Sequence, residues 1–248
     1  MTTDRLAVAR LLPYCVAVSP NGILNLDKPA GLTSARVVGI VKRLLPRGIK
    51  IGHAGTLDPF ATGILLLLVG KATKSCERLM DQPKQYKATI RLGATTATDD
   101  LDSPAVPWPG SGVATIPALS AVAATLPAFV GEIQQRPPVF SALKVAGRRA
   151  YDLARQGMTV VLQPRWVHVY GIELIEYQWP DLQLRIDCGR GTYIRSIARD
   201  IGQSLNCGGY LTELRRTRSG GFSIQQAVTL ETLKANGVEA HLHPVPDL

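Results

Sequence analysis

The stretch GHAGTLDPFATGILLLLVG, residues 52–70, joins a loop punctuated by glycines to an uninterrupted apolar run. The run, residues 64–69, has the length of a strand and a glycine on either side, which predicts a buried strand. The loop contains a single acid, Asp58, followed by Pro59. A residue before proline is kept out of helical geometry, and glycines allow close backbone approach. The segment therefore predicts a stiffly held carboxylate just before a buried strand.

Two roles are open for Asp58. An Asp-Pro dipeptide in a loop usually forms a turn or caps a helix. The surrounding sequence favours a chemical role, because six basic residues flank the loop: Lys42, Arg43, Arg47, Lys50, Lys71 and Lys74. Nearby cations depress the pKa of a carboxyl group. We therefore expect Asp58 to be ionised at neutral pH and able to act as a nucleophile or a base.

Segments on both sides of this stretch predict an α+β fold. Residues 86–92 and 182–188 alternate apolar and polar side chains, as strands with one solvent-facing side do. Residues 99–116, with their acids, prolines and glycines, predict an irregular surface loop. Four segments are expected to be helical: 33–45, 117–130, 192–205 and 229–235. Strands and helices do not alternate regularly, so we expect a mixed, largely antiparallel sheet flanked by helices.

The composition is that of a globular protein with a strong positive charge. Of 248 residues, 46% are hydrophobic, and 28 Lys and Arg against 19 Asp and Glu give a net charge of +9. This excess favours a polyanionic partner, either a nucleic acid or a membrane surface. The four cysteines form no C-x-x-C pair, which argues against a zinc site and a disulfide framework. The longest apolar run is too short to span a bilayer, so we expect a cytoplasmic protein.

Arginines and tyrosines occur close together in the second half of the chain. Arginines are clustered within 148–155, 185–199 and 215–218, and three tyrosines interleave with the basic residues: Tyr86, Tyr151 and Tyr193. Aromatic rings on which bases stack, beside cations that bind phosphates, suit an unstacked nucleic acid. Each cluster taken alone is equally compatible with a solvated basic surface.

Six motifs in order resemble the bacterial tRNA pseudouridine-55 synthase family of the TruB type, across about residues 21–235. They are GILNLDKPAGLTS at 22–34, GHAGTLDPFATGILLLLVGKATK at 52–74, QYKATIRLGATTATDD at 85–100, QQRPPVFSALKVAGRRAYDLARQG at 134–157, CGRGTYIRSIARDIG at 188–202 and GGYLTELRRTRSGGFSI at 208–224. The second is similar to the catalytic motif of the family, and the fourth to its RNA-clasping insertion. The resemblance implies a pseudouridine-synthase fold and isomerisation of one uridine, at position 55 in the T loop of tRNA, to pseudouridine.

The resemblance also implies roles for individual residues. Asp58 matches the catalytic aspartate, Tyr86 the tyrosine that stacks on the target base and is a candidate to take the C5 proton, and Arg195 the arginine that pairs with the aspartate. Six further positions are candidates for substrate binding. His53 matches a histidine that contacts the RNA at the place from which the target base has flipped out, and Tyr193 and Leu211 match residues of the base pocket. Lys28 matches a lysine with a mainly structural role, and Arg148 and Arg149 lie in the insertion.

The same resemblance sets expectations for partners and domains. It implies tRNA, bound through its T arm, as substrate, with no metal, no cofactor, no obligatory protein partner and a monomeric enzyme. We expect a leader of unassigned role at 1–20 and a catalytic domain at 21–240, with the RNA-binding insertion at 131–157. The family usually continues into a small C-terminal RNA-binding domain. We expect residues 241–248 to begin a tail, with that domain absent from this sequence.

One departure from the family pattern and three other interpretations accompany this resemblance. Ser103 stands where the tyrosine motif usually has a glycine, on a loop expected to be peripheral. A non-catalytic tRNA-binding or tRNA-folding module would not need Asp58, Tyr86 and Arg195 together. A guide-RNA-dependent enzyme of the same superfamily would rely on protein partners and a C-terminal domain. A carboxylate glycosidase would need two acids flanking one bond, whereas one acid occupies the candidate loop.

Overall fold

The computed structural model describes residues 19–109, 116–141, 143–145, 147–156, 158 and 160–246. Nearly all of the expected leader, and the last two residues of the expected tail, lie outside the described residues. The described chain forms a mixed α+β fold around one ten-stranded sheet, which confirms the predicted fold class.

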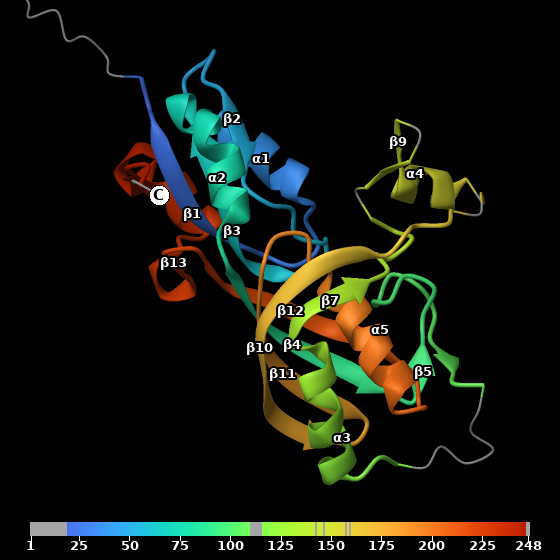
Figure 1. Ribbon diagram of the computed structural model, residues 1–248. Coiled ribbons are helices and arrows are strands. Elements are labelled where there is room, and N and C mark those ends of the chain that lie inside the picture. Colours follow the sequence, from blue (N-terminus) through green and yellow to red (C-terminus); the bar gives the residue numbers. More distant parts are fainter. Residues whose placement is uncertain are drawn as a thin grey trace, which may run out of the picture.

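The sheet is largely antiparallel (Figure 1). Its strands are β1 (Gly22–Lys28), β2 (Ile51–His53), β3 (Thr62–Val69), β4 (Lys84–Leu92), β7 (Gly131–Gln135), β10 (Arg165–Gln178), β11 (Asp181–Cys188), β12 (Gly209–Ser219), β13 (Phe222–Ser223) and β14 (Leu242–His243). Their order is β14-β1-β3-β12-β4-β11-β10-β7, with β2 paired to β3 and β13 to β12. β12 runs antiparallel to β4 but meets the start of β3 in parallel, over two residues. This short contact joins the two halves of the sheet.

Helices cover both halves. The α-helices of the described residues are α1 (Ser34–Arg43), α2 (Cys76–Asp81), α3 (Leu119–Thr125), α4 (Ala150–Arg155), α5 (Ile194–Ser204) and α6 (Leu230–Asn236). In Figure 1, α5 and α3 lie over one face of the β4, β11 and β10 part, and α1 and α2 lie beside β1 to β3. Two small ribbons stand apart from the sheet: β5 (Ala94–Thr95) with β6 (Val106–Pro107), and β8 (Lys144–Val145) with β9 (Arg148–Arg149). The insertion, with β9 and α4, projects from the body.

The apolar run at 64–69 is continuous because β3 is covered on both faces. Leu65 belongs to a cluster with Val37 of α1, and Leu66 on the opposite face belongs to a cluster with Leu79 of α2. All these side chains are fully or almost fully buried. A strand buried on two sides has no solvent-facing positions to fill with polar residues, so its sequence does not alternate. The predicted buried strand is therefore confirmed.

Most of the predicted elements are found near their expected bounds. The structure has strands β4 and β11 where alternating strands were expected at 86–92 and 182–188. It has helices α1 and α5 where helices were expected at 33–45 and 192–205. The Ala-rich segment 117–130, where a helix broken near Pro127 is expected, forms α3 followed by the 3-10 helix η2 (Leu126–Phe129). The sequence of the insertion predicts an extended start, because of Pro137 and Pro138, and a short helix closed by Gly157. The structure has β7 and α4 there, and Gly157 lies outside the described residues. β1, β10 and β12 were not predicted as strands.

Two glycines inside helices should respond oppositely to substitution by alanine. A Cβ at Gly39 of α1 would meet no atom within 4 Å, whereas a Cβ at Gly202 of α5 would lie 2.2 Å from the backbone of Gly208. We expect Gly39→Ala to raise the free energy of unfolding by about 0.5–1 kcal/mol through helix propensity. We expect Gly202→Ala to lower it by about 2 kcal/mol or more, because α5 must move away from β12. Urea denaturation measures both, and two changes of the same sign would contradict this account of the packing.

Candidate active site

A cavity of about 640 Å³ opens where the two halves of the sheet meet. Its walls come mainly from the loop before β3, the start of β4, the loop at 98–103, the turn before α5, β12 and the insertion, which contributes Phe140, Ser141 and Tyr151. Cavities of this size hold small molecules or single nucleotides. Asp58, Tyr86, Tyr193 and Arg195, which were predicted to act together, all line it.

The loop that carries Asp58 is held by buried side chains on both sides of the acid. Ser34 Oγ accepts from the backbone N–H of Leu57 at 2.9 Å and donates to its carbonyl at 3.0 Å. The ammonium of Lys28, which is fully buried, donates to the carbonyl of Pro59 at 3.1 Å and to two carbonyls of its own loop. These contacts fix the backbone next to Asp58, so the opening motif positions the catalytic loop.

A buried guanidinium extends this support to the tyrosine. Arg216 of β12 is only 1% exposed, and its Nε donates to the carbonyl of Ile64 at 2.6 Å. Its Nη2 donates to the carbonyl of Gly55 at 3.2 Å, and its Nη1 lies 3.5 Å from the hydroxyl of Tyr86. One side chain therefore links the glycine-rich loop, the first residues of β3 and the candidate tyrosine. In the sequence, Arg216 belongs to an arginine cluster that was expected to bind a nucleic acid, and this buried role was not predicted.

Arg195 joins Asp58 to a second, buried acid, Asp100. Its Nε lies 2.9 Å from Oδ2 of Asp58, and its Nη2 donates to Oδ1 at 3.1 Å. Its Nη1 lies 3.2 Å from the carboxylate of Asp100 and donates to the carbonyl of Thr98 at 3.0 Å. Its Nη2 also donates to the carbonyl of Phe140 at 2.9 Å. A planar guanidinium with five donors suits this set of partners.

The prediction that the pKa of Asp58 is depressed was wrong, because burial outweighs the effect of the neighbouring cation. Burial in the cavity raises the pKa of Asp58, and Arg195 lowers that pKa only in part, while Asp100 raises it further. The six basic residues that flank the loop in sequence do not line the cavity. The ion pair with Arg195 is therefore the main influence that keeps the carboxylate charged, and 30% of the side chain of Asp58 remains exposed toward the cavity.

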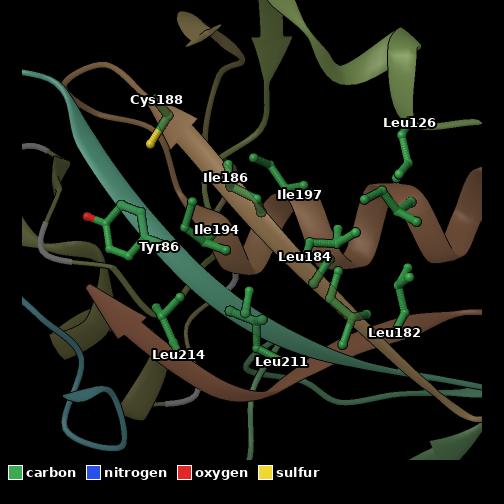
Figure 2. Packing of buried hydrophobic residues seen from close by; sticks show 14 of the residues in the cluster. Tyr86, Leu126, Leu182, Leu184, Ile186, Cys188, Ile194, Ile197, Leu211 and Leu214 are labelled. Carbon is green, nitrogen blue, oxygen red and sulfur yellow. The ribbon is translucent and has the colours of Figure 1, made fainter. Parts of the chain in front are cut away.

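Leu214, and not the predicted Leu211, lines the cavity. Leu214 lines the cavity together with Tyr86, whereas Leu211 is fully buried in the core and does not line it. Figure 2 shows Leu214 toward the ring of Tyr86 and Leu211 toward the middle of the packed cluster. Burial raises the pKa of Tyr86, and Arg216 lowers it in part, so the side chain faces the cavity as a phenol at neutral pH. An apolar floor and a phenol suit a flat, partly polar base.

Three of the other predicted substrate-binding residues, His53, Lys28 and Arg148, are outside the cavity wall. His53, on β2, does not line the cavity, and burial together with Arg216 lowers its pKa, which favours a neutral imidazole. Burial also lowers the pKa of Lys28, to about 8. Arg148 is exposed on β9, where its Nη2 donates to Oε1 of Gln156 at 2.6 Å. The side chain of Arg149 lies outside what the structure describes.

Several arginines that were expected to bind a polyanion are paired with acids instead. Arg190, at the cavity rim, contacts Glu77 at 2.7 Å and Asp81 at 2.8 Å. The same is true of three others, in the pairs Arg185–Glu173, Arg199–Asp99 and Arg215–Asp27. These arginines would have to exchange carboxylates for phosphates in order to bind RNA. The arginine clusters are therefore less open to a polyanion than their sequence suggests.

The loop around Ser103 was expected to be peripheral, and this expectation was wrong. Ser103 lines the cavity, and its Oγ accepts from the backbone N–H of Thr98 at 3.1 Å. The carbonyl of Thr98 in turn accepts from Arg195. The serine that stands in place of the usual glycine thus adds a hydrogen bond to Thr98, the residue whose carbonyl binds Arg195.

Among the described residues, no group of three or more His, Cys, Asp or Glu side chains could hold a metal ion. None of the described helices has the length and apolar character needed to cross a membrane.

A match to a family model places this chain, whose sheet and cavity are described above, among the pseudouridine synthases, which are isomerases. The family model for the N-terminal domain of TruB family pseudouridylate synthase matches residues 42–194. The model for the C-terminal domain of tRNA pseudouridylate synthase B matches residues 195–245. The chain therefore belongs to the TruB family of pseudouridylate synthases.

Curated proteins and solved structures agree with this assignment. The chain is 44% identical over 225 residues to tRNA pseudouridine synthase B of Aromatoleum aromaticum, an alignment that covers 90% of this chain and 70% of that protein. It is 46% identical over 212 residues to the protein of the same name from Bacteroides fragilis, and this alignment covers 83% of this chain and 89% of that protein. A chain in the crystal structure of a Cbf5-Nop10-Gar1 complex is similar at 33% identity and a TM-score of 0.65, covering 90% of this chain and 58% of that chain.

Proposed function

We propose that this enzyme converts the uridine at position 55 of the tRNA T loop to pseudouridine, with Asp58 as the catalytic carboxylate. The observation that carries the proposal is the two-point pairing of Asp58 with Arg195 at the wall of a cavity that Tyr86 and Leu214 also line. The relatives named tRNA pseudouridine synthase B support tRNA as the substrate. A net charge of +9 is consistent with a polyanionic substrate.

The reaction needs the target base outside the RNA stack. Flipping it costs a few kcal/mol, which contacts to phosphates and stacking on aromatic rings offset. In the cavity, the bond between C1′ and N1 breaks, the base turns, and a bond between C1′ and C5 forms. C5 then loses its proton and N1 ends protonated, so atoms and electrons balance without a cofactor.

Each residue of the proposed set has a distinct task. Asp58 begins the reaction by attacking C1′, by attacking C6 or by removing a sugar proton, and all three routes need its ionised form. Arg195 orients the carboxylate and favours its charge. Tyr86 and Leu214 give the turning uracil a flat, largely apolar surface, and the phenolic oxygen of Tyr86 is placed for proton transfer from C5. Tyr193 closes the pocket from the turn before α5.

A guide-RNA-dependent enzyme is the second candidate, because similar solved structures include a Cbf5-Nop10-Gar1 complex and an H/ACA RNP bound to a substrate RNA. Those chains share 30–33% identity with this one, whereas the curated synthases share 40–48%. The comparison favours an enzyme that acts on tRNA without a guide.

Tritium release from a bare tRNA transcript tests the proposal. The transcript carries 5-tritiated uridine, and its partner transcript has cytidine at position 55. We expect release of a single tritium per tRNA from the first, and none from the second, without added protein or guide RNA. Release that needs a guide RNA would favour the second candidate. Salt-sensitive tRNA binding without release would indicate a non-catalytic binding module.

A further inference from the structure

We propose that Gln135, at the start of the insertion, is a positioning residue that holds Tyr193 and the first turn of α5 in their catalytic geometry. This inference rests on the function proposed above. It gives the insertion a second task besides contact with RNA, because its first residues then support the catalytic ion pair.

Gln135 grips the backbone of one residue through both ends of its amide. It is the last residue of β7 and is only 2% exposed. Its Oε1 accepts from the backbone N–H of Tyr193 at 2.8 Å, and its Nε2 donates to the carbonyl of Tyr193 at 3.1 Å. The side chain therefore acts like a neighbouring strand and fixes the peptide groups on both sides of Tyr193.

This contact lies where the catalytic helix begins. Tyr193 is the residue before α5, and its side chain makes no capping hydrogen bond. The carbonyl of Tyr193 also accepts from the N–H of Ile197, so Gln135 and the first turn of the helix share one acceptor. Arg195 is the second residue of α5. A small rotation at Tyr193 would therefore move the guanidinium of Arg195 relative to Asp58.

The residues after Gln135 continue the attachment along α5. The carbonyl of Arg136 accepts from Oγ of Ser196 at 2.9 Å and from Nη2 of Arg199 at 2.9 Å. The carbonyl of Phe140 accepts from Arg195, the residue that pairs with Asp58. Backbone carbonyls of segment 135–140 thus accept hydrogen bonds from side chains in the first two turns of α5. A displacement of the insertion when RNA binds would reach the ion pair through these contacts.

Substitution by glutamate gives a sharp test, because β7 offers a matched control. Gln134 has the same side chain but lies exposed on the opposite face of the strand. In Gln135→Glu, a protonated carboxyl group can still donate to the carbonyl of Tyr193 and accept from its N–H, whereas the ionised carboxylate cannot donate. Burial favours the protonated form, and the cations Arg165, opposite on β10, and Arg199 on α5 favour the ionised form.

The single-turnover rate of tritium release, tRNA affinity and thermal stability are measured from mildly acidic to mildly alkaline pH. We expect Gln135→Glu to match the wild type in acid and to fall about 10- to 100-fold below it as the carboxyl group ionises. Gln135→Met should be slow at every pH, and Gln134→Glu should follow the wild type throughout. Affinity for tRNA should change less than about threefold, since the change acts on the chemical step.

Three results would overturn the proposal. One is that both Gln135 variants, folded at the assay temperature, react within about twofold of the wild type at every pH. Another is that Gln134→Glu shows the same loss as Gln135→Glu. The third is that both Gln135 variants unfold at the assay temperature, which would make the residue one of general stability. Failure of the proposed function would look different, because the wild type itself would then release no tritium.

Discussion

Replacing Asp58 by asparagine is expected to reduce the single-turnover rate on the order of 10⁴-fold while tRNA affinity stays within a few-fold of the wild type. The amide keeps the shape of the side chain but cannot act as a nucleophile or a base. It also cannot carry the charge that Arg195 pairs with at 2.9 Å. Binding should survive, because a substrate the size of tRNA makes most of its contacts elsewhere, through its phosphates. Tritium release and filter binding separate the two effects.

Asp102→Asn is the matched control for this experiment. Asp102 lines the same cavity, so the substitution exchanges the same functional group beside the same substrate. We expect the single-turnover rate to fall less than about tenfold, because Arg195 pairs with Asp58 and Asp100 and not with Asp102. The contact of Asp102 with Asp100 is made by its backbone N–H, which the substitution keeps. If Asp58→Asn kept a tenth of the wild-type rate, or if the two variants lost equally, Asp58 would not be the reacting group.

Arg195→Lys is expected to lower the rate by about 10²- to 10³-fold and to change its pH dependence. A lysine ammonium keeps the charge but cannot reach Asp58, Asp100 and the carbonyl of Thr98 together. Burial already raises the pKa of Asp58, and Arg195 opposes that shift. With weaker pairing the pKa rises further. The reaction needs the ionised carboxylate, so activity is lost as pH falls through this pKa, and the acid limb of the profile moves to higher pH.

Arg195→Lys should also lower the free energy of unfolding. Asp100, whose side chain is 3% exposed, would lose part of its pairing, and a poorly paired buried charge is destabilising by about 3 kcal/mol. Arg91→Lys provides the control, because Arg91 makes a two-point pair with Asp181 on the surface, far along β4. We expect Arg91→Lys to leave the rate and the acid limb unchanged and to lower the free energy of unfolding by less than about 1 kcal/mol. An unshifted acid limb in Arg195→Lys would mean that another group titrates.

Local sequence predicted the parts of the fold whose burial pattern is regular. β3 is apolar throughout because both its faces are covered, and β4 alternates because one face is solvated. β12 escaped prediction because its pairing with β4 shifts register between Leu211 and Glu213. That bulge places Leu211 and Leu214 on the same buried side, three residues apart, where a regular strand would place them on opposite sides.

The site was predictable only where a motif carries the reacting groups themselves. Asp58, Tyr86 and Arg195 were identified by resemblance and lie together. Their supports were missed because each joins residues far apart in the chain. Thr98 and Arg195 are 97 positions apart, and Gln135 and Tyr193 are 58 apart. A buried amide or serine has no local signature that distinguishes it from an exposed one, so these partners become visible only in three dimensions.

The position of β12 in the sheet also affects how the chain is made. β3 and β4 follow one another in sequence, but β12 separates them in the sheet and supplies Arg216 beneath the tyrosine. On the ribosome, β3 and β4 therefore each keep one open edge until β12, residues 209–219, has been synthesised. Such edges are prone to pair with other chains, and contacts this distant in sequence form slowly. The nascent polypeptide thus stays catalytically incompetent, and open to association with itself or with chaperones, until the central strand inserts.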